Sequence, residues 1–275
     1  MMSTPPKLRV LSLGAGVQST TLALMAAKGE VLPMPDCAIF ADTGAEPAAI
    51  YLHLDWLETQ LPFPVHRVSA GNLRDEITDA MTTEATRMDA RPPFFLKSGG
   101  MLNRQCTQDY KIIPIIRKVR ELLGLKKGQR GPKTPVVEQW IGISCDEAIR
   151  MKPSRLSFIK HRWPLIESGM HRHHCMRWCE DRHYPKPVKS ACTFCPYTDN
   201  ARWREMKLND PVSFADAVAI DKVIRPGMAG PKRPKDDAWF VHRDCVPLDE
   251  VDLTNAEDRG QLSMFNNECE GMCGV

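Results

Sequence analysis

The sequence predicts an α/β fold: a doubly wound parallel sheet with a Cys/His-rich C-terminal extension. Short apolar runs of strand length alternate with helix-length segments through the first half of the chain. Uninterrupted apolar strands separated by helices are typical of parallel sheets with both faces covered. After about Pro153 this periodicity weakens, and Cys, His and Pro become frequent. We therefore expect an α/β domain over residues 1–150 and a Cys-rich region over residues 151–275, packed on the same core.

Each predicted strand is a short, largely apolar run, separated from the next by turn residues and a helix-like segment. The predicted strands are Leu8–Leu13, Cys37–Ala41, Val65–Val68 and Gln139–Ile143. The predicted helices are Val17–Lys28, Glu46–Gln60, Pro114–Leu123 and Pro211–Ile224. Gly29 and Gly124 end the first and third helices, and Pro114 suits the first turn of the third. Residues 88–105 and 225–235 lack periodicity and are expected to be loops.

Composition places the chain among ordinary globular proteins. The 275 residues are 43% hydrophobic and 26% charged, and the net charge of +3 neither requires nor excludes a polyanionic partner. The N-terminus lacks the apolar segment of a signal peptide, and the uncharged run Val10–Ala27 is too polar to span a membrane. We expect a cytoplasmic protein with no membrane partner. Its ten cysteines would then be reduced, so clustered ones are expected to be ligands or reactive thiols.

The segment Ser12–Thr20 joins the first predicted strand to the first helix and is rich in small residues. Small residues let backbone N–H groups approach an anion, and a helix N-terminus favours negative charge. The segment is not a Walker loop, because no Gly-Lys-Ser/Thr follows. Ser19 also stands where the dinucleotide-binding pattern has Gly or Ala. The segment alone is therefore either a phosphate-binding loop or a structural turn.

Two further polar motifs follow predicted strands. Asp42-Thr43-Gly44 lies at the end of the second predicted strand, and the stretch from Gly142 to Glu147 lies at the end of the fourth, Gln139–Ile143. Ligands of open α/β sheets bind at the carboxyl ends of the strands. Since all three motifs fall at such ends, the sequence favours a nucleotide site over a simple turn.

These motifs resemble, in the same order along residues 8–200, those of the PP-loop (adenine nucleotide α-hydrolase) superfamily, and most closely the phosphoadenosine phosphosulfate (PAPS) reductase-like family. Val17-Gln18 resembles a pair found in some family loops, and Asp42-Thr43-Gly44, with Glu46 and Tyr51, resembles the motif at the adenosine pocket. Gly142, Asp146 and Arg150, in and after the fourth predicted strand, are similar to the family's Gly…Arg-Asp…Arg segment. The resemblance implies nucleotide-binding roles for Ser12, Gly14, Ala15, Gly16, Gln18, Ser19, Thr20, Asp42, Thr43, Gly44, Gly142, Asp146 and Arg150.

Two cysteines, Cys192 and Cys195, have the spacing that places two thiolates on one metal ion or cluster edge. Zn²⁺ could take them together with Cys175 and a histidine. The resemblance instead favours a [4Fe–4S] cluster on Cys106, Cys175, Cys192 and Cys195. Arg104–Thr107, with Lys111 and Pro114 beyond it, is similar to the family's Cys-Cys segment but holds a single cysteine, Cys106, so one ligand has to come from elsewhere.

The C-terminal Glu268–Gly271 resembles the catalytic tail of the reductases but lacks its histidine. The resemblance nominates Cys269 as an attacking thiol and Cys273 as a resolving thiol or a fourth cluster ligand. With the single Cys106, this departure looks more like the divergent family members of phages and mobile elements than a housekeeping enzyme.

The stretch Lys111–Lys133 holds eight cations against one acid, Glu121. It is either a solvated helix face with a loop or a polyanion-binding surface, for the phosphates of a sulfonucleotide or for a nucleic acid. Interleaved aromatic residues are missing, so base stacking is not indicated.

The resemblance implies an oxidoreductase like phosphoadenylyl-sulfate reductase. A thiol would attack the sulfur of an adenylylated sulfate, and a second thiol, with a thioredoxin-like reductant, would release sulfite. The alternative on the same fold is an ATP pyrophosphatase-type sulfurtransferase, which would adenylate and thiolate tRNA or DNA with Mg²⁺. A second alternative is a zinc-binding interaction module on an inactive scaffold. Sequence does not choose between sulfonucleotide and ATP, since both place adenosine and phosphate in the same pocket.

Overall fold

The computed structural model describes residues 5–83, 88, 91–228 and 237–254. The chain divides into two compact units. The first consists of the residues up to Asp42, Ala48–Ala70 and Lys111–Ser190, and the second of Thr43–Pro47, Gly71–Tyr110 and the residues from Ala191 onward. The predicted boundary at residue 150 falls inside the first unit, because the next strand along the chain still joins its sheet.

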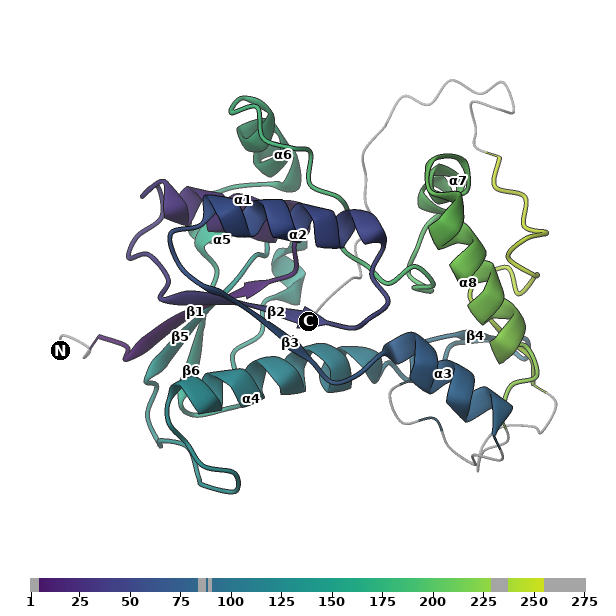
Figure 1. The fold of residues 1–275 in the computed structure, drawn as a ribbon, viewed down its shortest axis with the longest axis horizontal. Coiled ribbons are helices and arrows are strands. Elements are labelled where there is room, and N and C mark those ends of the chain that lie inside the picture. The colour runs from purple at the N-terminus through teal and green to yellow at the C-terminus, as the bar shows by residue number, and fades with distance from the viewer. Residues whose placement is uncertain (1–4, 84–87, 89–90, 229–236, 255–275) are drawn as a thin grey trace. The chain divides into compact units, whose positions relative to one another are not determined.

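The first unit is built on a five-stranded sheet with the order β3-β2-β1-β5-β6 (Figure 1). Every neighbouring pair in it is parallel, so the predicted α/β fold with a parallel sheet is confirmed. The strands are β1 (Leu8–Leu13), β2 (Cys37–Asp42), β3 (Val65–Ser69), β5 (Val137–Ile141) and β6 (Ile159–Arg162). The helical segments of this unit are α1 (Val17–Ala27), α2 (Ala48–Gln60), α4 (Ile113–Leu122), the 3-10 turn Cys145–Arg150, α5 (Pro164–Glu167) and α6 (Arg172–Glu180).

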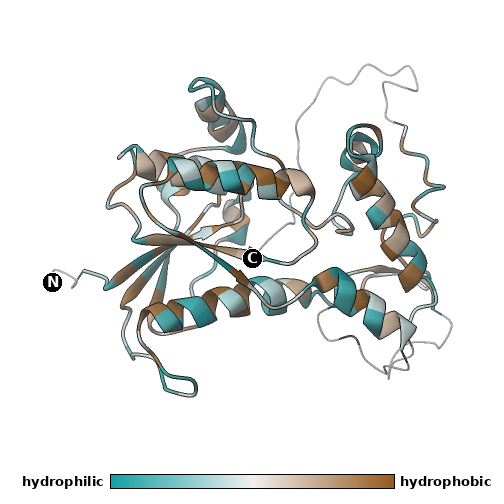
Figure 2. Cartoon of the chain, in the orientation of Figure 1, coloured by the Kyte–Doolittle hydropathy of each residue, from teal (hydrophilic) through white to brown (hydrophobic). Residues whose placement is uncertain are grey.

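Alternate side chains of the strands enter two separate hydrophobic cores, as the pleat of a strand requires. Leu11 and Phe40 pack with α1, α2 and α6 on one face. Val10 and Ile39 pack with α4 on the other face. The central strands β1 and β2 are apolar along most of their length (Figure 2), which is typical of strands buried on both sides. The doubly wound arrangement is therefore present in this unit.

The predicted strands and helices of this unit have nearly the same residue bounds as the observed ones, and the small differences have local causes. β1 has the predicted bounds, and Gly124, with φ of 70°, follows α4 as expected. Helix α2 begins at Ala48 rather than Glu46, because a residue that precedes a proline disfavours the helical conformation. Strand β5 lies two residues earlier than predicted, because it pairs with β1 from Leu8 to Ser12 and leaves the ladder at Gly142.

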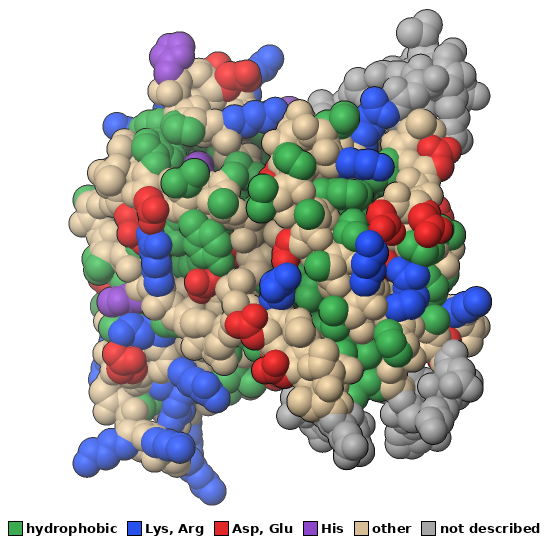
Figure 3. Space-filling model, turned by 45° about the vertical axis from the view of Figure 1, so that its right-hand side comes forward, with side chains coloured by type: hydrophobic (Ala, Val, Ile, Leu, Met, Phe, Trp, Pro, Cys, Tyr) green, Lys and Arg blue, Asp and Glu red, His purple; other side chains and the backbone are tan. Residues whose placement is uncertain are grey.

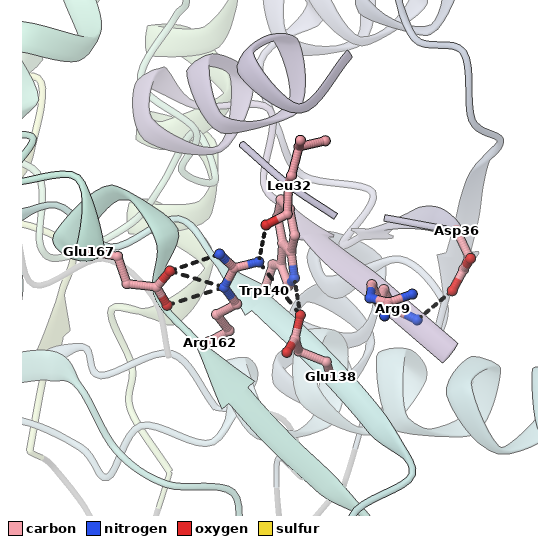
Figure 4. A network of polar contacts seen from close by, with 7 residues as sticks. All are labelled: Arg9, Leu32, Asp36, Glu138, Trp140, Arg162 and Glu167. Carbon is pink, nitrogen blue, oxygen red and sulfur yellow. Dashed lines mark hydrogen bonds and ion pairs between the residues drawn. The ribbon is translucent and has the colours of Figure 1, made fainter. Parts of the chain in front are cut away.

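Strand β6 at the sheet edge was not predicted, since its sequence from Ile159 to Arg162 is mostly polar. Its Arg162 lies over the Trp140 ring, 4.8 Å from the guanidinium carbon to the ring centroid (Figure 4). The same guanidinium donates to the Glu167 carboxylate at 2.8 Å and to the carbonyl of Leu32 at 3.0 Å. Tertiary contacts of one arginine thus hold an edge strand that local pattern does not specify.

The second unit is mainly helical and has its own core. Its elements are α3 (Leu73–Thr82), the short strands β4 (Phe95–Leu96) and β7 (Trp239–Phe240), the first three residues of the π-helical turn Gln108–Ile112, α7 (Asn200–Asn209) and α8 (Pro211–Ile224). Trp203 and Trp239 are fully buried in this core. α8 has the predicted bounds, whereas α3 and α7 were missed although Asn72 and Asp199 cap them.

Asp221 of α8 is the polar centre of this core. Its carboxylate is fully buried, pairs with Arg225, and accepts the N–H groups of Val241 at 2.8 Å and Leu248 at 3.1 Å. The Asp221 carboxylate therefore provides hydrogen-bond acceptors for backbone N–H groups of the segment that follows α8. In the part of the chain that the structure describes, no helix is both long enough and apolar enough to cross a membrane.

Candidate functional site

The predicted nucleotide loop lies where the order of the parallel sheet reverses. From β1 the chain runs outward through β2 and β3, and it returns to the other side of β1 as β5 and β6. The carboxyl ends of β1 and β5 are therefore neighbours at a topological switch point, the usual ligand crevice of open α/β sheets. Ser12, Gly14, Ala15, Gly16, Gln18, Ser19, Thr20, Gly142, Asp146 and Arg150 all lie within the segments that follow these two strands or at their ends.

The loop between β1 and α1 is a tight turn held by Ser19. The Ser19 hydroxyl accepts the N–H of Gly14 at 3.2 Å and donates to the carbonyl of Gly16 at 3.3 Å. Ala15, in the middle of the turn, is buried with φ of 54°, a left-handed conformation that a residue with a side chain rarely adopts. Strain at a helix entry is a frequent feature of ligand-binding turns. The turn opens directly on the N-terminus of α1, and the N–H groups of a helix's first turn are able to bind an anion.

Gly142 is required by the close approach of two backbones. A methyl group at this position would lie 3.0 Å from both the Cα and the N of Ser19, and 3.3 Å from the carbonyl carbon of Gln18. The end of β5 thus passes directly against the first turn of α1. The predicted role of Gly142 in the nucleotide site has a structural basis in this packing, which sets the position of the loop.

A chain of polar side chains links the first turn of α1 to the segment after β5 and to α6. Arg172 donates to the Gln18 side-chain oxygen at 3.0 Å, and the Gln18 amide donates to Glu147 at 3.2 Å. Glu147 also forms an ion pair with Arg150. Burial raises the pKa of Glu147, while Arg150 opposes that shift. Sequence reasoning found Gln18 and Arg150 but missed Glu147 and Arg172, which are their partners.

Asp146 accepts the backbone N–H of Arg172 at 2.8 Å and so anchors the start of α6. Burial alone would raise the pKa of this carboxyl, but the N–H groups of Arg172 and of Asp146 itself, together with the Ser144 hydroxyl, lower it. Asp146 is therefore an ionised anchor of the loop. Next to it, His171, His173 and His174 form an exposed group of rings, with the last two centroids 3.9 Å apart.

Asp42 at the end of β2 accepts a hydrogen bond from the Tyr51 hydroxyl of α2 at 2.8 Å. The two side chains are partly exposed, and β2 is the neighbour of β1 in the sheet. The sequence grouped Asp42 and Tyr51 through the adenosine-pocket resemblance, and the structure brings them into contact.

The other two residues of that motif belong to the second unit. The Thr43 hydroxyl lies 3.4 Å from the Cys192 sulfur, and the N–H of Thr193 donates to the carbonyl of Ala45 at 2.9 Å. The Thr193 hydroxyl donates to Asp216 at 2.6 Å, and Asp216 also pairs with Arg74. The Thr43–Ala45 segment and the Cys192–Cys195 turn are therefore bonded to each other.

Gly44 has φ of 68°, and a Cβ there would lie 2.9 Å from the Asn72 side chain that caps α3. This glycine is needed both for its left-handed conformation and for the close approach.

The predicted metal ligands are divided between the two units. Cys106, Cys192 and Cys195 lie in the second unit, where Cys106 and Cys192 pack partly buried against the core. Cys175 lies in the first unit, on α6, with no exposed surface. Burial, followed by the neighbouring Cys179, raises the pKa of Cys175 to about 12. Cys175 packs in the apolar core that α6 shares with α1, and its role as a ligand stays a prediction.

Among the described residues, no three His, Cys, Asp or Glu side chains are grouped so that they could hold a metal ion. The described thiols therefore do not make a [4Fe–4S] or Zn²⁺ site by themselves, and both cofactors stay predictions. The candidate catalytic residues Cys269 and Cys273 lie outside the described residues.

Comparison with known proteins gave structural similarity alone. Protein-family models gave no match, and neither did the curated proteins. Among solved structures, the chain is similar to a phosphoadenylyl-sulfate (PAPS) reductase from Candida auris in a phosphate complex. The identity is 12% and the TM-score 0.44, over 67% of this chain and 76% of that one. It is also similar to the U34-tRNA thiolase NcsA from Methanococcus maripaludis with its [4Fe–4S] cluster, at 14% identity and a TM-score of 0.42, over 79% of this chain and 73% of that one.

Proposed function

We propose that this protein is a PAPS-reductase-like enzyme that binds an adenine sulfonucleotide and reduces it to sulfite. The observation that carries the proposal is the Ser19-held turn at the switch point of the sheet, with the backbone of Gly142 packed against it. That arrangement presents a helix N-terminus at the position where open α/β sheets bind phosphates.

The nucleotide phosphate would lie at the first turn of α1. Backbone N–H groups of this turn would donate to it, and Ser19 would keep the turn in shape through its two hydrogen bonds. Arg172, tied to Gln18, adds positive charge beside the same turn. Asp42, oriented by Tyr51, is the candidate acceptor for a ribose hydroxyl or an adenine amine.

The chemical step would be carried by thiols. The Cys269 thiolate would attack the sulfate sulfur, forming an S–S bond while the S–O bond to the nucleotide phosphate breaks and the nucleotide leaves with that electron pair. The Cys273 thiolate would then attack the Cys269 sulfur, forming a disulfide and releasing sulfite. A thioredoxin-like dithiol would supply two electrons to reduce that disulfide. We assign no step to a metal or a cluster, because the described thiols do not form such a site.

Calorimetric titration of anaerobic protein tests the nucleotide site, with ATP, adenylylsulfate and its 3′-phosphorylated form as ligands. We expect a sulfonucleotide to bind most tightly. Ser19→Ala removes a hydroxyl bonded to two backbone groups and should cost about 1–2 kcal/mol of binding. Ser157→Ala, which removes a hydroxyl bonded to the carbonyl of Pro132, is the matched control and should bind as the parent does. If the parent, Ser19→Ala and Ser157→Ala bound nucleotide with equal affinity, the turn held by Ser19 would not be part of the nucleotide site.

Sulfite release from the bound sulfonucleotide, in the presence of thioredoxin, tests the reaction. Cys269→Ala should abolish release while leaving nucleotide affinity unchanged. Tight binding of ATP with Mg²⁺, without any sulfonucleotide binding, would instead support the sulfurtransferase that thiolates tRNA or DNA. That second function is favoured by the exposed cations Lys126, Lys127, Arg130 and Lys133, which could bind the phosphates of a nucleic-acid substrate. Failure to bind any of the three nucleotides would support the zinc-binding interaction module.

A further inference from the structure

The loop between α4 and β5, residues 123–136, carries four exposed cations: Lys126, Lys127, Arg130 and Lys133. We call it the basic loop. The sequence holds no acidic residue between Glu121 and Glu138, and Glu121 is paired with Lys118. Figure 3 shows Lys and Arg side chains gathered on the protrusion at the lower left, where Figure 1 places this loop. The loop is also among the most hydrophilic parts of the ribbon in Figure 2.

The basic loop has a defined conformation. Arg120 of α4 donates to the carbonyls of Lys126 and Gln129, and the Gln129 side chain accepts the N–H of Lys126 at 3.0 Å. A Cβ at Gly131 would overlap the Phe158 ring at 2.5 Å, so the loop packs closely on the segment before β6. The exposed cations therefore extend from a structured turn, which limits the entropy lost when they bind a ligand.

Two neighbouring segments add charge of the same sign. The exposed Lys7 donates its backbone N–H to the carbonyl of Val136 at 2.8 Å, at the end of the basic loop. The exposed Arg155 lies two residues before Ser157, whose hydroxyl donates to the carbonyl of Pro132 at 2.9 Å. Six cations from three segments thus meet at one end of the sheet.

This end is opposite to the nucleotide loop. β1 pairs with β5 from Leu8 and Val137, just after Lys7 and the basic loop, whereas the nucleotide loop follows Leu13 at the other end of β1. A strand of this length separates the two ends by roughly 20 Å. The cations of the basic loop therefore do not serve the phosphates of a nucleotide bound at Ser12–Thr20, which leaves a polyanion as the ligand that their charge fits.

We propose that the basic loop, with Lys7 and Arg155, binds the phosphodiester backbone of a nucleic-acid duplex. Residues 123–136 expose no aromatic and no large apolar side chain, so the surface offers neither base stacking nor insertion into a lipid layer. Backbone contacts by spaced cations are the interaction that supplies sequence-independent duplex binding. This inference goes beyond the proposed function and does not depend on which reaction the nucleotide site performs.

Fluorescence anisotropy with a labelled 20-base-pair RNA duplex and the matching DNA duplex tests the proposal. For the DNA duplex, four phosphate contacts predict that affinity falls about 150-fold between 50 and 200 mM salt. Replacing Lys126, Lys127, Arg130 and Lys133 together by Gln should remove most of this salt dependence and weaken binding about tenfold or more. Replacing only Lys127 and Arg130 should remove about half of it. A preference between the two duplexes identifies the natural partner.

A matched control removes the same charge elsewhere. The variant with Lys97, Arg177, Lys186 and Lys207 replaced by Gln takes four exposed cations that lie outside the basic loop and its two neighbouring segments, and should bind duplex like the parent. Equal weakening in both quadruple variants would mean that only net charge matters and would overturn the proposal. So would binding to phosphatidylserine vesicles, but not to either duplex, that depends on the basic loop. Nucleotide affinity at Ser19 should be unchanged in the basic-loop variant, which separates this result from the test of the proposed function.

Discussion

Gly142→Ala tests the packing that positions the predicted nucleotide loop, Ser12–Thr20. The added methyl group would lie 3.0 Å from the Cα and N of Ser19, whereas ordinary contacts of a Cβ begin at 3.4 Å. The atoms that it meets belong to the backbone at the start of α1, so a side-chain rotation does not relieve the clash. The first turn of α1 would have to move away from β5 by several tenths of an ångström.

The change in the free energy of unfolding caused by Gly142→Ala is the sum of two opposing effects. Overpacking of this kind costs about 1–3 kcal/mol. Gly142 is outside the left-handed region, so Ala meets no backbone strain there and gains about 0.4–1 kcal/mol through the unfolded state. The free energy of unfolding should therefore fall by about 1–2 kcal/mol. Displacement of the Ser19 N–H from a bound phosphate should weaken nucleotide binding about tenfold, the equivalent of one partly lost charged hydrogen bond.

Urea denaturation followed by circular dichroism measures the free energy of unfolding. Calorimetric titration with the nucleotide that binds the parent measures the nucleotide affinity. Gly16→Ala and Gly14→Ala are graded controls, because their Cβ atoms would lie 3.5 Å and 3.7 Å from the nearest neighbour. Both should lower the free energy of unfolding less than Gly142→Ala does. If Gly142→Ala binds nucleotide as tightly as the parent, the contact between β5 and α1 does not set the geometry of the site.

Three further predictions concern stability. Asp221→Ala should lower the free energy of unfolding by about 3–5 kcal/mol in urea denaturation, because it leaves buried partners without their carboxylate. Burial lowers the pKa of His53, whose Nε2 lies 3.0 Å from the Thr20 hydroxyl. As pH falls, the imidazole of His53 is therefore protonated in the unfolded chain before it is protonated in the folded protein. The free energy of unfolding should decrease as pH falls below about 6.5, and it should decrease less between pH 7 and 5 in His53→Gln. Arg162→Ala should cost about 1–3 kcal/mol by removing the bonds to Glu167, whereas unchanged denaturation midpoints would show that this edge network contributes nothing.

Much of the sheet and of the nucleotide loop could be predicted from local pattern. The apolar run Leu8–Leu13, the small residues after it and the helix that follows are all properties of neighbouring residues. Residues at the carboxyl ends of parallel strands meet at one edge, so the grouping of the loop with Gly142 and Asp146 also followed from the sequence. The cap residue Asn72 before α3 is likewise a local signal for a helix start.

The partners of the predicted residues could not be found in this way. Arg172 contacts Gln18 across 154 positions of sequence, and Glu147 contacts it across 129. The stretch around Cys175 is rich in Cys and His and predicts a ligand there, and the structure places Cys175 on α6 in the apolar core against α1. Its spacing of four from Cys179, also buried, is the helical signal that indicated a shared inner face.

The sequence by itself determined the strands β1, β2, β3 and β5, the helices α1, α2 and α4 and the loop that opens α1, because residue preferences and periodicity act over a few neighbouring positions. Only the tertiary structure decided which end of the sheet each charge occupies. Because α4 lies between β3 and β5, two parallel strands, the chain returns along it to the amino ends of the strands. The basic run that starts at Lys111 therefore places Lys126–Lys133 at the edge opposite the nucleotide loop. Such separations follow from the packing of distant segments, which no local pattern encodes.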